Sequence, residues 1–233
     1  MNLFNLKKVR LFADDRTVHM EAREVAPGQN SPTERHPDSD VAMLFFEGQG
    51  EVLVADRVHA FKAVQFAYAR SGTAFQLRNT GAAKLRYLTA VCPPGRVEHP
   101  RTLDPKAGPG GVTIFKVDQY DRIPDSGLVR GGMFFQEPGG STYQLSQDES
   151  TKIFVVLKGE CELTVGAVTK RIVPGDVVVI PQEATHMVRN PGAEKLAMWV
   201  TVTPNTSPSH TRYEQQPDGS WKRVTPRADG SLT

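Results

Sequence analysis

Apolar residues in this chain come in short runs, and turn-forming residues separate the runs. The runs recur about every 8–12 residues, with Gly, Pro, Asp or Asn between them. No long window shows the three- and four-residue spacing of an amphipathic helix. The pattern is typical of β-strands joined by turns, so we expect an all-β fold. The clearest strand candidates are residues 41–46, 51–54, 85–91, 112–115, 153–157, 162–165, 177–180 and 196–202.

The sequence repeats itself at an offset of 111 residues without a gap. Of the 44 positions from 48 to 91, ten carry the same residue as their equivalents from 159 to 202. Gly48 falls on Gly159, and Asn79 falls on Asn190. A repeat of this length indicates two copies of a small domain. We therefore expect an N-terminal domain over residues 1–104 and a C-terminal domain over residues 105–233 that ends in a polar tail, joined through residues 93–111.

Composition and charge exclude several classes of partner. The net charge is +2, and no block of Lys and Arg is interleaved with aromatic residues, so we expect no nucleic-acid partner. No run of about 20 apolar residues exists and the first residues lack the apolar stretch of a signal peptide, so we expect no membrane partner. Cys92 and Cys161 are not equivalent in the two copies. This favours free thiols in a reducing cytoplasm, where we expect the protein to reside.

Four residues of the second copy point to a family. Gly175, Pro181, His186 and Asn190 follow the spacing G-x5-P-x4-H-x3-N. The pattern resembles the second signature of the cupin superfamily, and glycines at positions 140 and 159 frame the first signature at the right separation. The resemblance covers roughly residues 20–102 and 130–213. It implies two tandem jelly-roll β-barrels, a bicupin, whose barrels pack against each other as single cupins do in dimers.

The resemblance also places the residues that would line the C-terminal barrel. Cupins usually hold a divalent metal with two His and one Glu of the first signature and the His of the second. In the second copy the equivalent positions carry Ser146, Asp148, Lys152 and His186, so only His186 matches. The Lys152 ammonium would stand where a metal-binding carboxylate is usual, and like charges repel in a low-dielectric pocket. We therefore expect no cofactor, with a divalent metal such as Fe, Mn, Ni or Zn as the alternative.

The first copy departs further from the metal-binding pattern. Its equivalent positions carry Arg35, Pro37, Val41 and Phe75. Residues 41, 43 and 45 share one side of a strand, with residue 75 across the barrel, which predicts a filled apolar interior and a structural role. A weaker alternative is a metal held after a one-residue bulge, by Glu34, His36 and Asp40.

Three ionisable residues of the second copy are therefore the candidates for chemistry. Lys152 would bind a substrate carboxylate or stabilise a developing oxyanion, His186 would transfer a proton, and Asp148 would orient one of them. A buried Lys152 could also react as an amine nucleophile. We expect further substrate contacts from the barrel wall, at Ser146, Tyr143, Gln144 and Trp199.

Three functions remain open at this point. The one we favour is a metal-independent acid–base enzyme of the isomerase, epimerase or lyase type that binds a small anionic metabolite in the C-terminal barrel. The second is a non-catalytic ligand-binding or dimerisation cupin, in which Asp148 and Lys152 are the ion pair of a decayed metal site. The third is a divergent metal-dependent cupin such as a dioxygenase. The pairing of two barrels in one chain leaves a homodimer possible.

Overall fold

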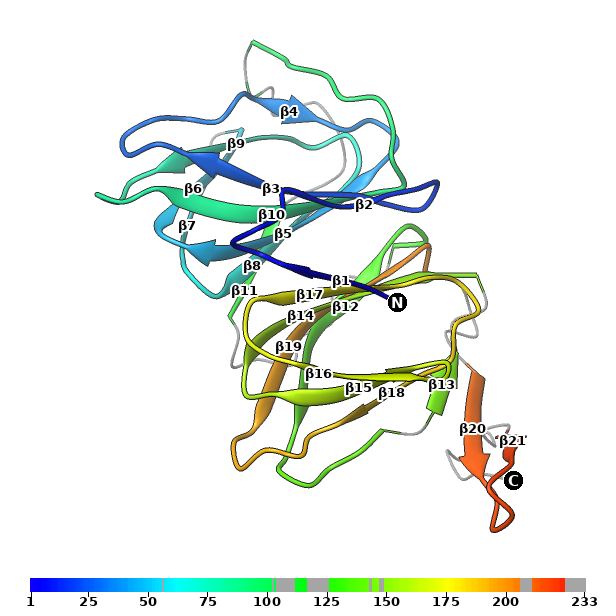
Figure 1. The fold of residues 1–233 in the computed structure, drawn as a ribbon. Helices are drawn as coiled ribbons and strands as arrows, with labels where there is room; N and C mark the ends of the chain where they lie inside the picture. The colour runs from blue at the N-terminus through cyan, green and yellow to red at the C-terminus, as the bar shows by residue number, and fades with distance from the viewer. Residues whose placement is uncertain are drawn as a thin grey trace.

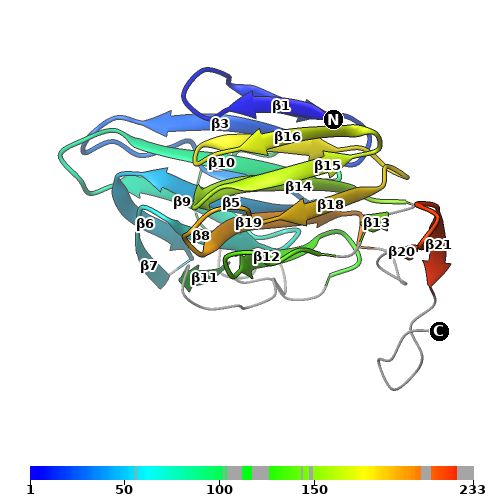
Figure 2. The same cartoon turned by 60° about the horizontal axis from the view of Figure 1, so that its bottom comes forward.

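The computed structural model describes residues 1–55, 57–101, 103, 112–116, 126–142, 144–146, 149–205 and 211–224. Every regular element in these residues is a β-strand, which confirms the all-β prediction. None of the described segments forms a helix that is long and apolar enough to cross a membrane. The strands form four sheets, and the sheets build two barrels that lie against each other (Figure 1 and Figure 2).

The N-terminal barrel has a six-stranded and a four-stranded sheet. The larger sheet has the order β11 (Val112–Lys116), β8 (Gln65–Ala69), β5 (Asp40–Glu47), β10 (Leu85–Cys92), β3 (His19–Val25) and β2 (Leu11–Asp14). The smaller sheet has the order β4 (Glu34–Arg35), β9 (Ala74–Asn79), β6 (Gln49–Val54) and β7 (Arg57–Lys62). All neighbouring strands are antiparallel.

The C-terminal barrel has a five-stranded and a six-stranded sheet. The first has the order β1 (Asn2–Asn5), β17 (Asp176–Ile180), β14 (Thr151–Lys158), β19 (Leu196–Thr203) and β12 (Arg130–Gln136). The second has the order β16 (Val168–Ile172), β15 (Cys161–Val165), β18 (His186–Arg189), β13 (Gln144–Ser146), β20 (Thr211–Gln215) and β21 (Trp221–Val224). The terminal pair β20–β21 extends this sheet at one side of the molecule (Figure 2).

The two copies adopt the same backbone conformation at equivalent turns. In five pairs of residues separated by 111 positions, both residues have a positive φ angle. The pairs are Gly28 (71°) and Gly139 (77°), Gly48 (88°) and Gly159 (72°), Ala55 (52°) and Gly166 (57°), Val64 (66°) and Gly175 (90°), and Gly72 (77°) and Glu183 (63°). Positive φ is costly for a residue that carries a Cβ. The barrel therefore imposes these turns even where the glycine has been lost, and the predicted duplication is confirmed.

The Gly48 and Gly159 turns also have the same close neighbours. A Cβ at Gly48 would lie 2.8 Å from the carbonyl oxygen of Lys84, and a Cβ at Gly159 would lie 2.9 Å from that of Lys195. Lys84 and Lys195 are themselves equivalent in the repeat. Because both contacts are with backbone, neither position can accept a side chain without moving the neighbouring strand.

The two barrels exchange one strand each. β1 pairs with β17 of the C-terminal barrel, with Leu3 opposite Val178, and β11 pairs with β8 of the N-terminal barrel, with Ile114 opposite Ala67. The boundary expected between residues 104 and 105 is therefore crossed in both directions, because each copy donates its first strand to the other copy. Residues 104–111 of the predicted connection lie outside the described residues.

The described residues form three apolar clusters, one inside each barrel and one between them. The side chains of β14 alternate between two of these clusters. Phe154 and Val156 face the interior of the C-terminal barrel, and Ile153 and Val155 face the N-terminal barrel. The cluster between the barrels includes side chains from both copies, such as Leu88 and Trp199. The barrels therefore pack through sheets that are buried on both faces, as the pairing of single cupins predicts.

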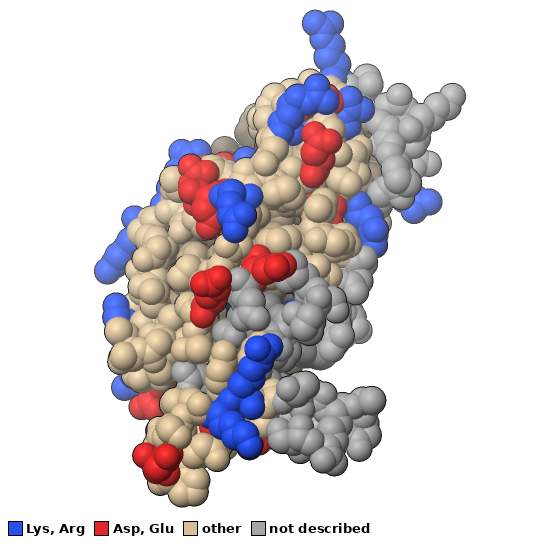
Figure 3. Space-filling model, turned by 90° about the vertical axis from the view of Figure 1, so that its right-hand side faces the viewer, with Lys and Arg blue, Asp and Glu red and all other residues tan. Residues whose placement is uncertain are grey.

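Charges are mixed on the surface. On the face shown in Figure 3, Lys and Arg side chains lie among Asp and Glu side chains, and most of the remaining described surface is uncharged. The described basic side chains on this face form no continuous stripe of the kind that follows a nucleic-acid backbone.

Removal of residues 2–5 tests the strand exchange. We expect hydrogen exchange of the β17 backbone amides to become at least about tenfold faster, because β17 becomes an unpaired edge strand. The amides of β8 provide the internal control, since β8 keeps its partner β11. Faster exchange in β8, with β17 unchanged, would contradict the exchanged topology.

Candidate functional site

Lys152 and His186 meet inside the C-terminal barrel. Lys152 lies on β14 and His186 begins β18, and the Lys152 Nζ atom is 2.9 Å from the His186 Nε2 atom. Lys152 is 7% exposed and His186 is 2% exposed. Lys152 shares the inward face of β14 with Phe154 and Val156, as strand alternation predicted. Two of the three residues proposed for chemistry are thus in direct contact.

Burial controls the charge of Lys152. Loss of solvent, and to a smaller extent the charge of the nearby Arg130 guanidinium, together lower the pKa of its ammonium to about 7. In the described part of the chain, no carboxylate forms an ion pair with Lys152. The ammonium lies 5.7 Å from the centre of the Phe154 ring, and this contact offsets a small part of the desolvation. Lys152 therefore holds or releases its proton near neutral pH.

The hydrogen bonds of His186 assign the tautomer of its ring. The Nδ1 atom lies 3.3 Å from the carbonyl oxygen of Ala184, which can only accept, so Nδ1 carries a proton in this contact. The Nε2 atom then presents its lone pair to Lys152 Nζ. The ring is also packed edge-on against Phe154, with 5.9 Å between the ring centres. These contacts fix the orientation of the imidazole and direct Nε2 toward Lys152.

The side chains of four other predicted site residues, Tyr143, Gln144, Ser146 and Asp148, are not described. Tyr143 and Asp148 lie outside the described residues, so the pairing of Asp148 with Lys152 stays a prediction. Gln144 and Ser146 lie on β13, where only their backbone is described, opposite Tyr213 and Thr211 of β20.

Trp199 does not line the barrel interior. Its side chain is fully buried in the cluster between the two barrels. On β19 the neighbouring residue Met198 takes the inward face instead. The expected wall contact at Trp199 was wrong because both faces of this strand are buried, and alternation alone does not say which face is inward.

The centre of the N-terminal barrel is filled, as expected. Val41, Met43 and Phe75 all belong to its interior cluster. Phe45 and Phe61 stack in the same cluster with ring centres 3.5 Å apart. Two of the four positions equivalent to cupin metal ligands, Val41 and Phe75, therefore contain apolar side chains of the barrel interior in this copy.

The weaker metal alternative does not assemble. Glu34 and His36 come together, with 3.3 Å between Glu34 Oε2 and His36 Nε2. Asp40 instead faces the region between the barrels, because it begins β5 on the side of Ala42 and Leu44. There its carboxylate accepts a hydrogen bond from the Ser71 backbone N–H at 2.8 Å and further hydrogen bonds from the hydroxyls of Tyr68 and Ser126. The expectation that Glu34, His36 and Asp40 could converge was wrong.

Sequence reasoning missed a polar cluster beside the filled centre. His19, Glu21 and Arg23 share one face of β3, opposite Val91, Thr89 and Tyr87 of β10. Arg23 donates from Nε to Glu21 at 2.6 Å and from Nη1 to Glu34 at 2.6 Å. The signal in the sequence is the alternation of three ionisable residues at positions 19, 21 and 23, each of which lacks an identical counterpart in the second copy.

Electrostatics of this cluster favour an ionised Glu34. Burial raises the pKa of its carboxyl, but hydrogen bonds from His36 and the charge of Arg23 outweigh burial, so the pKa lies below its ordinary value. Burial is also the main reason that the pKa of Tyr87 is raised to about 12. The Nδ1 atom of His36 is buried and has no hydrogen-bond partner among the described residues.

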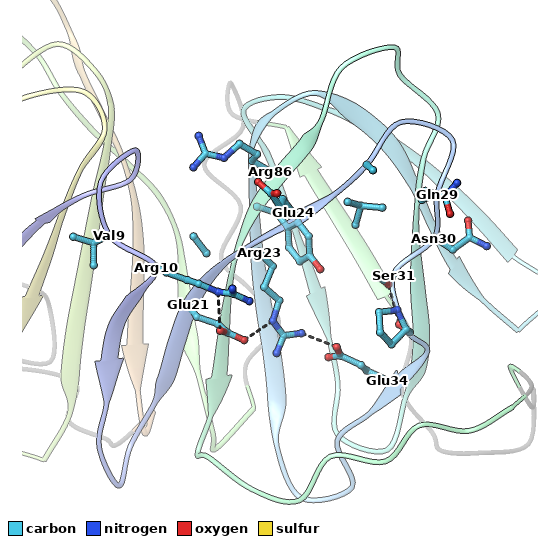
Figure 4. Close-up of a pocket in the computed structure, with 15 residues that line it drawn as sticks. Val9, Arg10, Glu21, Arg23, Glu24, Gln29, Asn30, Ser31, Glu34 and Arg86 are labelled. Carbon is cyan, nitrogen blue, oxygen red and sulfur yellow. Dashed lines mark hydrogen bonds and ion pairs between the residues drawn. The ribbon is translucent and has the colours of Figure 1, made fainter.

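Two cavities border the cluster and share Arg23 and Glu34 in their walls. The smaller has a volume of about 330 Å³ and includes three histidines, His19, His36 and His99. The larger has a volume of about 690 Å³ and is drawn in Figure 4. Figure 4 shows Arg10, Glu21, Arg23 and Glu34 in a row across the larger cavity. We call the larger cavity the β3 groove.

The described residues do not fit the metal that the cupin resemblance implies. A metal bound at His186 Nε2 would lie about 2.1 Å from that nitrogen, where Lys152 Nζ, at 2.9 Å, would crowd and repel it. In the N-terminal barrel, the Arg23 guanidinium is already bound to Glu34. In the part of the chain that the structure describes, no three His, Cys, Asp or Glu residues are placed to hold a metal ion.

Comparison with known proteins supports the fold. The family described as Cupin domain matches the chain twice, over residues 22–91 and 132–203. No curated protein matches the sequence at a significant level. Among solved structures, salicylate 1,2-dioxygenase from Pseudaminobacter salicylatoxidans has a TM-score of 0.70 at 12% identity, with 81% of this chain and 72% of that chain covered.

Two further solved structures show the same arrangement. A variant of that dioxygenase in complex with gentisate has a TM-score of 0.69 at 12% identity, with 81% of this chain and 70% of that chain covered. A variant of oxalate decarboxylase from Bacillus subtilis has a TM-score of 0.59 at 13% identity, with 87% of this chain and 76% of that chain covered. At these identities the likeness shows the fold alone.

Proposed function

This chain belongs to the cupin domain family, with one cupin in each half, and from that premise we propose that its C-terminal barrel binds a small carboxylate and acts on it by proton transfer. The observation that carries the proposal is the contact of 2.9 Å between Lys152 and His186 inside the barrel. The reaction class is isomerisation, epimerisation or a lyase reaction such as decarboxylation, since each of these needs a proton to be moved at a bound anion.

The carboxylate would be recognised by Lys152. A buried ammonium is unfavourable without a counter-charge, and no described carboxylate supplies one. An anionic ligand beside Lys152 would raise its pKa from about 7 and keep it protonated. Two structurally similar proteins are named for salicylate and oxalate, and one of them has a structure in complex with gentisate; all three molecules are carboxylates. These names support the substrate class.

His186 would transfer the proton. Its Nδ1 atom is engaged with the Ala184 carbonyl, so Nε2 is the atom that can accept or donate the proton in the barrel. The ammonium of Lys152, 2.9 Å away, would stabilise negative charge that develops on the ligand as the proton leaves. Phe154 excludes water from one side of both groups and so strengthens these interactions.

Binding measured against pH tests the proposal. We expect salicylate, gentisate or oxalate to bind, and the analogue salicylamide, which is neutral at pH 6 and pH 7, not to bind at those pH values. Above pH 7 the affinity should fall by about tenfold for each pH unit, because the protonated fraction of Lys152 falls by that factor. His186→Gln should leave binding within about threefold of the wild type and abolish conversion of any bound acid, since Gln cannot carry a proton near neutral pH. Isothermal titration calorimetry between pH 6 and pH 9 gives both affinity and proton uptake.

Equal binding of salicylamide, or affinity that does not change between pH 7 and pH 9, would show that Lys152 is not the anion site.

A second candidate function, a metal-dependent dioxygenase using Fe, Mn, Ni or Zn, is favoured by the structural similarity to salicylate 1,2-dioxygenase. Stoichiometric metal in the purified protein that resists chelators would select this candidate. Binding of a carboxylate without any conversion would instead select the ligand-binding module.

A further inference from the structure

The polar cluster of the N-terminal barrel is not required by the barrel fold. The second copy builds the same barrel with Phe134 at the position of Arg23 and Leu145 at the position of Glu34. A largely buried ion pair of this kind is often no more stable than apolar residues of similar size. The first copy therefore keeps Arg23 and Glu34 for a reason other than closing its barrel.

The β3 groove carries no net charge in its wall. It is lined by three arginines and three glutamates, Arg10, Arg23, Arg86, Glu21, Glu24 and Glu34. Each charge already has a partner, and Figure 4 shows the chain of contacts from Arg10 through Glu21 and Arg23 to Glu34. At the upper edge, Glu24 pairs with Lys84 at 2.8 Å and Arg86 pairs with Glu47 at 3.5 Å.

The equal numbers of positive and negative side chains in the groove wall favour a ligand without net charge. An anion would have to displace Glu21 or Glu34 from Arg23. Each of these carboxylates accepts a hydrogen bond of 2.6 Å from the Arg23 guanidinium. A cation would be repelled by Arg10 and Arg23. A hydroxyl group can donate to a carboxylate and accept from a guanidinium in the same site, so it binds without breaking the ion pairs.

The rim of the groove also favours an uncharged ligand that both donates and accepts hydrogen bonds. Gln29, Asn30 and Ser31 line it with two amides and one hydroxyl, groups that both donate and accept hydrogen bonds (Figure 4). The volume of about 690 Å³ lies within the usual range for small-molecule sites. We propose that the β3 groove binds a small neutral polyhydroxylated molecule, a polyol or monosaccharide, with Arg23 and Glu34 at its floor.

A charge-matched set of sugars tests the ligand class. Glucose, glucuronate and glucosamine have similar size and differ in charge, so they are titrated into the full chain labelled with ¹⁵N at pH 7. We expect glucose to shift the backbone amides of β3 and of residues 29–34, and the two charged sugars to bind at least about tenfold more weakly. Equal or tighter binding of either charged sugar at these amides would refute the charge-balance argument. The absence of any shift with all three would refute the site.

Residues of the second copy supply the matched variant. Arg23→Phe together with Glu34→Leu removes both partners of the ion pair at once and installs the side chains that the sister barrel uses. We expect this double variant to fold and to lose the response to glucose. A response that is unchanged would overturn the proposal.

A second variant keeps the proposal testable if the double variant fails to fold. Asn30→Ala changes only an exposed rim residue and should weaken glucose binding severalfold. Lys62→Gln, at an exposed position on the far edge strand β7, is the control and should have no effect. If Asn30→Ala binds glucose as tightly as Lys62→Gln does, the rim takes no part and the proposed site is wrong. The groove lies in the N-terminal barrel, so these outcomes are independent of the carboxylate tests on the C-terminal barrel.

Discussion

Lys152→Met is expected to raise the free energy of unfolding by about 2–4 kcal/mol at pH 6, and to abolish carboxylate binding. In the unfolded chain the amine has its ordinary pKa of 10.5, whereas in the folded protein the pKa is about 7. Below pH 7 folding must therefore bury an ammonium. Met has a similar length and no charge, so the variant escapes this cost.

The sign of the pH dependence follows from the two pKa values. Below about pH 7 both states of the wild type are protonated, and the full cost of burial is present. Between pH 7 and pH 10.5 the folded state has lost the proton while the unfolded state keeps it, so the wild type gains stability as pH rises. The advantage of Lys152→Met should therefore shrink across this range and vanish above it.

Urea unfolding followed by circular dichroism at pH 6, 8 and 10 measures the effect. Lys158→Met is the matched control, because Lys158 is exposed at the end of the same strand and its replacement should change stability by less than about 0.5 kcal/mol at each pH. An advantage of equal size at pH 6 and pH 10, or a variant less stable than the wild type, would show that Lys152 is not buried as a destabilised cation.

Trp199→Ala is expected to lower the free energy of unfolding by about 3–5 kcal/mol. Trp199 is fully buried between the barrels, and no described residue accepts a hydrogen bond from its indole N–H, so the loss comes from packing and from the cavity that remains. The cluster around it includes Leu44 and Leu88 of the N-terminal barrel and Val155 of the C-terminal barrel. The cavity therefore weakens the contact between the two copies.

The second tryptophan of the chain provides the control. Trp221 lies on the terminal hairpin and is 42% exposed, so Trp221→Ala should cost less than about 1 kcal/mol. The comparison uses urea unfolding of both variants at pH 7. If Trp199→Ala were no more destabilising than Trp221→Ala, the cluster between the barrels would not be the continuous core that the structure shows.

The architecture could be predicted from the amino-acid sequence alone. Short apolar runs between turn residues identified strands, and the offset of 111 residues identified two copies. The repeat also located turns that depend on backbone geometry, including the one where Gly48 and Gly159 both have positive φ. These features are local or repeat in register, so they can be recognised before any strand is paired with another.

The inward face of single strands was predictable only in part. Alternation correctly grouped Lys152 with Phe154 inside the C-terminal barrel, and Val41 with Met43 inside the N-terminal barrel. It gave no means to place Trp199, because both faces of β19 are largely buried. A period of two separates the faces of a strand, but only the position of the neighbouring sheets decides which face is inward.

The strand exchange and the two clusters of ionisable residues could not be predicted before the strands were placed in space. β1 joins β17 across more than 170 residues, and Lys152 meets His186 across 34. Arg23 reaches Glu34 because the chain crosses from one sheet of the N-terminal barrel to the other between these residues. Such contacts depend on how sheets close around a core, since residues far apart in sequence become neighbours only when their strands pair and the barrel curves to bring their side chains together.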